Sequence, residues 1–316
     1  MRRYSRQSVL GISLCLVLTG TAARASAQTV PNAVADNGMD VSVARPAYAA
    51  GTGPVVAIDE GHNNYHTLEG RYAPFGAVLT NDGYRVIPLR GRFSAEALAK
   101  ITVLVIANPL AASNVESWKL PTPSAFDDVE IDAVKTWVEQ GGSLFLIVDH
   151  MPFAGAAGAL AKALGFEFDN AYAVKGDGRS PEIFSWEAKT LADNAITRGS
   201  GRAPAVSEVQ TFMGSSFRAP AGATPIMALD EDWALLYPSE VGKFDAATPR
   251  RTAAPADLRG AALDRGKGRI VVVSEAALFT NQLVNGAPYG FGQPSARQDK
   301  QFLINIVEWL SRAPPP

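Results

Sequence analysis

Histidine occurs only three times in this chain of 316 residues, and each occurrence follows a segment with the apolar character of a buried strand. His62 and His66 come after residues 54–59, and His150 comes after the apolar run of residues 143–149. Carboxylate and amide side chains also stand near strand ends: Asp59, Glu60, Asn63, Asn64, Asn108, Asp149 and Glu275. Because the carboxyl ends of parallel strands meet at one edge of a sheet, we expect these side chains to form a single site.

Three roles are open for this cluster. Imidazole and carboxylate groups bind zinc and similar divalent cations, so His62, His66, His150 and Asp59 are a candidate metal site. Without a metal, a histidine held by a carboxylate can act as a general base toward water or a hydroxyl group. The candidate catalytic residues are His62, His150, Glu60, Asp149 and Glu275. In the third interpretation these residues only cap and turn the backbone where strands end.

A long loop over residues 108–125 carries the remaining candidate, Trp118. Loops of this length beside a sheet are often lids. We therefore expect Trp118 to contact a substrate together with Asn63, Asn64 and Asn108. The chain has no Gly-x-Ser-x-Gly motif, so nothing in the sequence indicates the nucleophile turn of an α/β-hydrolase.

The cluster favours a hydrolase that acts on an ester, an amide or a glycan-related small molecule. A divalent metal such as zinc is the one cofactor that these side chains could bind. The alternative is a non-catalytic binding protein, associated with the cell envelope, that uses the same residues to hold a ligand.

Apolar runs of strand length alternate with amphipathic segments along the chain. Strands are expected over residues 54–59, 84–89, 101–107, 143–149 and 269–274. Helices are expected over residues 72–82, 93–99, 127–140, 154–164 and 299–311. Strands that are apolar throughout are typical of a parallel sheet with helices on both faces. We therefore expect an α/β fold with a flavodoxin-like, doubly wound, mostly parallel sheet.

One large domain is expected over residues 51–312. Within it, short β-like runs between Gly and Pro residues indicate an antiparallel, β-rich insertion over residues 166–260. Residues 28–50 show no sustained period and are expected to be a flexible tether, and residues 313–316 a tail.

The first 27 residues have the pattern of a secretory signal peptide. Three Arg residues precede the apolar run 9–18, and Ala25 and Ala27 supply small residues before the expected cleavage site. The protein is therefore expected to be exported, to the periplasm or the medium. No second apolar run approaches the length of a membrane span.

Removing residues 1–27 changes both the charge and the chemistry. The segment carries four of the 29 basic residues and none of the 31 acidic ones, which leaves 25 against 31 and a net charge of −6. This balance argues against nucleic acid as a partner. The segment also contains Cys15, the only cysteine, so the mature chain has no thiolate.

Several motifs together resemble a known family. They are Asp59-Glu60-Gly61-His62-Asn63-Asn64, Asn-Asp-Gly-Tyr at 81–84, Asp149-His150-Met151-Pro152-Phe153, Ser274-Glu275-Ala276-Ala277 with Gln282, and the segment 301–310. The chain resembles an uncharacterised bacterial domain family of the class I glutamine amidotransferase-like superfamily, which is related to gliding-motility and intraflagellar-transport domains. The resemblance covers about residues 50–312 and implies a flavodoxin-like fold. Glutamine amidotransferases use a cysteine nucleophile, and the mature chain has none, so no glutaminase activity is expected.

Overall fold

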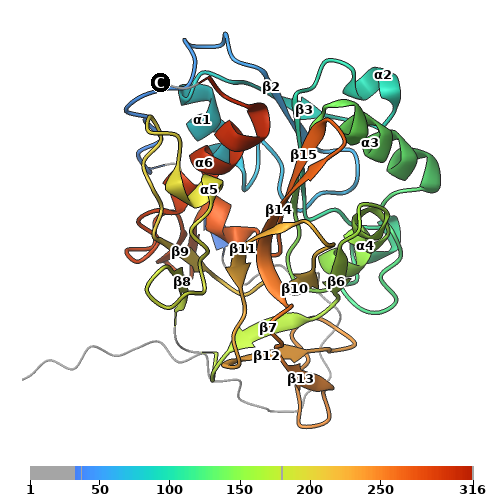
Figure 1. Cartoon of the computed structure of the whole chain (residues 1–316). Helices are drawn as coiled ribbons and strands as arrows, with labels where there is room; N and C mark the ends of the chain where they lie inside the picture. Colours follow the sequence, from blue (N-terminus) through green and yellow to red (C-terminus); the bar gives the residue numbers. More distant parts are fainter. Residues whose placement is uncertain (1–32, 37, 179–180, 315–316) are drawn as a thin grey trace, which may run out of the picture.

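A large mixed sheet forms the centre of the molecule. The computed structural model describes residues 33–36, 38–178 and 181–314 (Figure 1). Within them, nine strands form this sheet in the order β3-β2-β4-β5-β15-β14-β10-β6, with β11 beside β14. The parallel strands are β2 (Val55–Asp59), β3 (Arg85–Leu89), β4 (Val103–Ala107), β5 (Ser143–Ile147) and β15 (Gly268–Val273). Numbered along the chain, these five strands have the spatial order 2-1-3-4-5.

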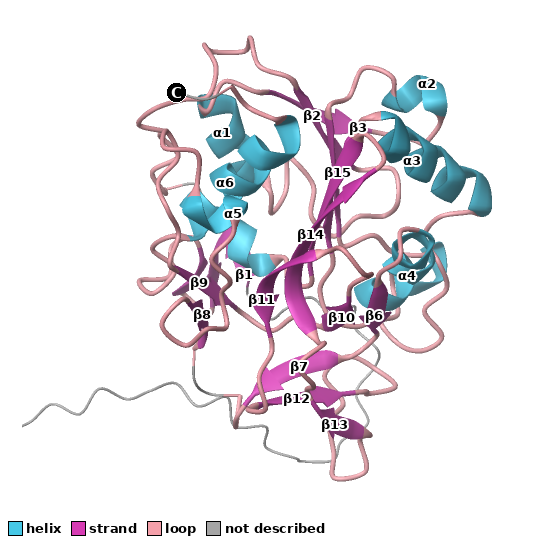
Figure 2. Cartoon of the chain, in the orientation of Figure 1, coloured by secondary structure: helices cyan, strands magenta, loops and turns pink. Residues whose placement is uncertain are grey.

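Helices cover both faces of the parallel strands. They are α1 (Ala73–Asn81), α2 (Ala95–Leu98), α3 (Asp128–Gln140), α4 (Phe153–Ala163) and α6 (Asp299–Ser311). Alternate side chains of each strand enter two separate cores: Val105 packs with Phe75 and Phe302, whereas Leu104 packs with Val134 and Leu160. Figure 2 shows α1 and α6 on one side of the sheet and α2, α3 and α4 on the other. The expected alternation of strands and helices is therefore confirmed, with ends that differ by one or two residues.

Antiparallel strands extend the sheet and form two smaller sheets. The extension consists of β6 (Glu167–Asp169), β10 (Ser216–Arg218), β11 (Thr224–Ala228) and β14 (Leu258–Arg265). The smaller sheets contain β7 (Tyr172–Lys175), β12 (Trp233–Leu236) and β13 (Arg250–Thr252), and β8 (Glu182–Ser185) with β9 (Glu208–Thr211). The short helix α5 (Ala195–Arg198) also lies in this region. Arg251 on β13 connects its small sheet to the extension of the large sheet. Its Nη2 lies 2.9 Å from Asp169 Oδ2 on β6 and 2.9 Å from Asp257 Oδ1.

The segment before residue 51 differs from the expected flexible tether. Its strand β1 (Ala33–Ala35) pairs with β16 (Asn281–Val284), which forms a hairpin with β17 (Ala287–Gly290). Val41, Val43 and Tyr48 pack against the core, and the Ala47 amide donates to Asp82 Oδ1 at 2.7 Å. The described part of the segment is thus packed against the domain, because its apolar side chains gain burial there.

The signal peptide expected over residues 1–27 lies outside the described residues. In the part of the chain that the structure describes, no helix is both long enough and apolar enough to cross a membrane.

Candidate functional site

Asn108 joins three strand ends at the carboxyl edge of the parallel sheet. It follows β4 in a left-handed conformation, with φ of 46°. Its Oδ1 accepts a hydrogen bond from the Asp149 amide at 2.7 Å, and its Nδ2 lies 3.2 Å from His66 Nδ1. Its carbonyl accepts from the Tyr65 amide at 2.9 Å. The structure therefore brings His66, Asn108 and Asp149 together, as expected from the strand ends.

The same contacts fix the tautomer of His66. Because Asn108 Oδ1 accepts from the Asp149 amide, the Asn108 Nδ2 group must donate to His66 Nδ1. The proton of neutral His66 then sits on Nε2. Burial, with a smaller contribution from Arg71, lowers the pKa of His66 to about 3, so the ring is neutral at physiological pH. His66 is therefore a hydrogen-bond donor rather than a base.

His62 belongs to a separate buried ion cluster. Its Nδ1 lies 2.8 Å from Asp59 Oδ1, and its Nε2 lies 3.0 Å from Glu130 Oε1. Burial opposes the charged form, but the hydrogen bonds and charges of Asp59 and Glu130 raise the pKa of His62 above its ordinary value. Both ring nitrogens of His62 are therefore occupied in this arrangement, and its roles as base and metal ligand stay predictions.

Four other predicted residues of this loop also have structural partners. Asp59 accepts from the Gly61 amide and from Asn64 Nδ2, in addition to His62. Glu60 accepts from the Leu68 amide and from Arg90 Nε. Asn63 donates to the Leu110 carbonyl. These bonds hold the loop after β2. The roles of Asp59 as a metal ligand, of Glu60 as a catalytic residue, and of Asn63 and Asn64 as substrate contacts stay predictions.

His150 retains an available ring nitrogen. Its Nδ1 lies 2.6 Å from the Met151 carbonyl oxygen, which can only accept, so Nδ1 carries the proton in the neutral ring. Its Nε2 then presents a lone pair and has no hydrogen-bond partner in residues 33–36, 38–178 and 181–314. The ring stacks on Tyr172 at 4.0 Å and is partly exposed. This geometry suits a general base.

Asp149 and Glu275 bring two carboxyl groups to the ends of β5 and β15. Glu275 is fully buried and accepts from the Ala277 and Leu278 amides at 2.7 and 2.9 Å. Burial and then the charge of Asp149 raise the pKa of Glu275 well above its ordinary value, and Arg259 and the two amides offset this only in part. Glu275 therefore keeps its proton to a higher pH than an isolated glutamate would.

Two charged residues that contact the candidate residues or lie near them were not predicted, Glu130 and Arg259. Glu130 lies in the first turn of α3, where it also forms a capping box with Asp127. Arg259 is fully buried on β14, and its Nε and Nη1 lack hydrogen-bond partners among the described residues. The sequence does single out Arg259, because it is a charged residue within the otherwise apolar segment 258–263.

Trp118 lies in an aromatic cluster rather than alone over the sheet. Its ring is 5.1 Å from Tyr65 and 5.1 Å from Phe153, edge to face in both cases. His150 in turn lies 6.1 Å from Phe153. Trp118 thus borders the site and can still contact a ligand there.

The predicted metal site is not assembled. The described ranges contain no group of three or more His, Cys, Asp or Glu residues placed to hold a metal ion. Each of His62, His66 and His150 has its own partner for Nδ1.

Comparisons with known proteins establish similarity of fold. No family model and no curated protein matches the chain. Similar solved structures include the mmIFT52 N-terminal domain, with a TM-score of 0.57 and 11% identity over 81% of this chain and 97% of that one.

Two further similar structures have lower TM-scores. A ThuA-like protein from Bacteroides uniformis has a TM-score of 0.46 and 12% identity over 83% of this chain and 93% of that one. A GMP synthase-like protein from Thermoplasma acidophilum has a TM-score of 0.40 and 11% identity, over 82% and 95%. The expected link to intraflagellar-transport domains is thus seen as similarity of fold.

Proposed function

We propose that the protein is a hydrolase that cleaves an ester, amide or glycosidic bond of a neutral small molecule at the ends of β4, β5 and β15. The supporting observation is that Asp149 and Glu275 follow adjacent parallel strands, each two residues after the paired Ile147 of β5 and Val273 of β15. Two neighbouring carboxyl groups with little compensating charge weaken a fold, so their presence in one site favours a catalytic role.

The side chains have complementary roles in the proposed reaction. His150 Nε2 accepts a proton from water while the water oxygen forms a bond to the electrophilic carbon. The bond from that carbon to the leaving oxygen or nitrogen breaks, and the leaving atom takes the proton held by the carboxyl pair. In this proposal the proton leaves the pair through Asp149, which is 9% exposed, whereas Glu275 is fully buried. The Nε2–H of His66 is a donor toward developing negative charge.

The charge of the site favours a neutral substrate. Glu275, Asp149 and Glu182 all contribute, after burial, to the raised pKa of Tyr289, so their negative potential extends across the site. Arg259 is the counter-charge, with its Nη2 3.5 Å from Glu182 Oε2. With one proton on Glu275, the charges of Asp149 and Glu182 still outnumber that of the buried Arg259, so this side of the site disfavours an anionic ligand.

We further infer that the sheet is of the flavodoxin-like, doubly wound type and that the chain belongs to the uncharacterised bacterial family that its motifs resemble. The order 2-1-3-4-5 of the parallel strands supports the fold assignment. The two cores on opposite faces of the sheet support it as well.

A substrate panel tests the proposed function. p-Nitrophenyl esters, p-nitroanilides and p-nitrophenyl glycosides are incubated with the wild-type protein and with His150→Gln. We expect turnover of at least one class, and a loss of kcat/KM of about 10²-fold or more in His150→Gln, because the general base is removed. The matched control is Glu187→Gln, which changes an exposed carboxylate on another loop. No turnover by the wild type, or equal rates for His150→Gln, would contradict the proposal.

A further inference from the structure

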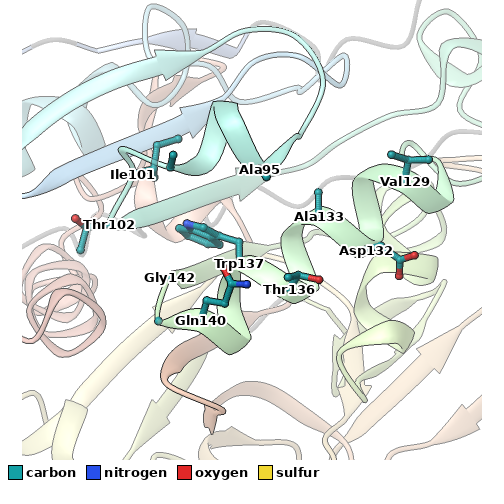
Figure 3. Close-up of a pocket in the computed structure, with 12 residues that line it drawn as sticks. Ala95, Ile101, Thr102, Val129, Asp132, Ala133, Thr136, Trp137, Gln140 and Gly142 are labelled. Carbon is teal, nitrogen blue, oxygen red and sulfur yellow. The ribbon is translucent and has the colours of Figure 1, made fainter.

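A cavity of about 660 Å³ lies between α2 and α3, away from the strand-end site (Figure 3). Ile101 and Thr102, which precede β4, and Gly141 and Gly142, which precede β5, form one end of it. The cavity is therefore at the amino edge of the parallel sheet, whereas Asp149 is at the carboxyl edge. A ligand could occupy it without touching the site described above.

Two parallel rows of side chains on α3 line this cavity. One row is Val129, Ala133 and Trp137, and the other is Asp132, Thr136 and Gln140. In each row the residues are four positions apart, so they lie on one face of the helix, one above the other. Each row extends about 12 Å along the helix. Figure 3 shows both rows on the same helix beside the cavity.

Trp137 provides the aromatic surface. A β-carbon on Gly142 would overlap the indole ring, so glycine at this position lets the ring lie against the backbone. In the described residues the indole Nε1 has no hydrogen-bond partner, and the ring is only partly buried. The ring is thus held in place and remains available to a ligand that stacks on it.

The second row provides polar groups that the fold does not use. Asp132, Thr136 and Gln140 are exposed or half-buried, and their side chains form no hydrogen bond or ion pair within the described ranges. Asp132 is the one charged residue among those that line the cavity, and no cation faces it there. This composition disfavours phosphates and other anions. It suits a ligand with many hydroxyl groups and no charge.

We propose that this cavity binds a neutral oligosaccharide. A pyranose ring has an apolar face, which would stack on Trp137, and hydroxyl groups at its edge, which would bond to Asp132, Thr136 and Gln140. The length of the two rows suits a chain of such rings rather than one. An apolar peptide helix fits less well, because it would leave the polar row buried without partners. The proposal is independent of the hydrolytic function.

Calorimetric titration with cellotetraose, maltotetraose and xylotetraose tests this proposal. We expect at least one tetraose to bind the wild-type protein. Trp137→Ala should raise its Kd at least about tenfold, because the surface on which a sugar ring stacks is lost. The double variant Asp132→Ala/Gln140→Ala changes only exposed side chains, so it should fold normally and also raise the Kd.

Two control variants make the outcome specific. Lys135→Ala, on the same helix but outside the cavity, and Asp149→Asn, at the strand ends, should leave the Kd unchanged. Absence of binding by all three tetraoses would overturn the proposal. So would binding that Trp137→Ala and the double variant both leave intact, or binding that Asp149→Asn abolishes. Neither result would affect the hydrolase proposal, which depends on turnover by the other site.

Discussion

Asp149→Asn is expected to abolish hydrolysis and, at the same time, to make the protein more stable. The substitution keeps the acceptor Oδ1 for the His150 amide and removes the charge beside Glu275. Loss of the proton donor should lower kcat/KM by about 10²-fold or more. Loss of the repulsion should raise the Tm by about 2–4 °C, which corresponds to about 1 kcal/mol in a domain of this size.

Opposite changes in activity and stability are characteristic of residues kept for function. Calorimetric unfolding and a rate assay on the same preparation measure both. The matched control is Asp232→Asn, an exposed aspartate with no side-chain hydrogen bond in the part of the chain described, which should change neither quantity. A lower Tm in Asp149→Asn would show instead that the carboxylate stabilises the fold.

His62→Ala is expected to have the largest effect on stability. It leaves the buried Asp59 without its counter-charge, and it leaves Glu130 with only the exposed Arg92. Removal of one member of a buried ion cluster costs about 3 kcal/mol or more. Urea unfolding should show this loss as a lower midpoint. His150→Ala is the matched control, since that ring is partly exposed and its removal should cost no more than about 1 kcal/mol.

The contribution of His62 should depend on pH. Its pKa in the folded protein is raised above the unfolded value, so the folded state binds the proton more tightly. The stabilisation is therefore complete below about pH 6.5 and declines as the pH rises through the folded pKa. The difference in unfolding free energy between wild type and His62→Ala should shrink over that interval. A difference that grows with pH would contradict a His62 pKa that is higher in the folded state than in the unfolded state.

The regular elements could be predicted because their residues repeat with a clear period. β5 is buried along its whole length and is apolar after Ser143, and α6 occupies the predicted residues 299–311. β6, β10 and β13 have only three residues each, too few to show a period. The hairpin of β16 and β17 was missed although Asn285-Gly286, with φ values of 51° and 79°, is a favoured turn sequence.

The positions of the histidines could be predicted, but their chemistry could not. The strand ends place His62 and His66 at one edge of the sheet. The sequence alone does not distinguish the chemical roles of the two rings. Their partners decide the difference: Glu130 is 68 residues from His62, and Asn108 is 42 residues from His66. The pKa of the His62 ring is consequently raised and that of the His66 ring is lowered, a difference that only tertiary contacts determine.

The coupling of Asp149 and Glu275 can be measured directly by an NMR titration of protein labelled with ¹³C at the glutamate carboxyl carbons. We expect one signal, absent in Glu275→Gln, to titrate well above the ordinary glutamate value of about 4.3, and to move toward that value in Asp149→Asn. If every glutamate titrates near its ordinary value, or if the raised signal is unchanged in Asp149→Asn, the two carboxyl groups do not share a proton and the proposed site is wrong.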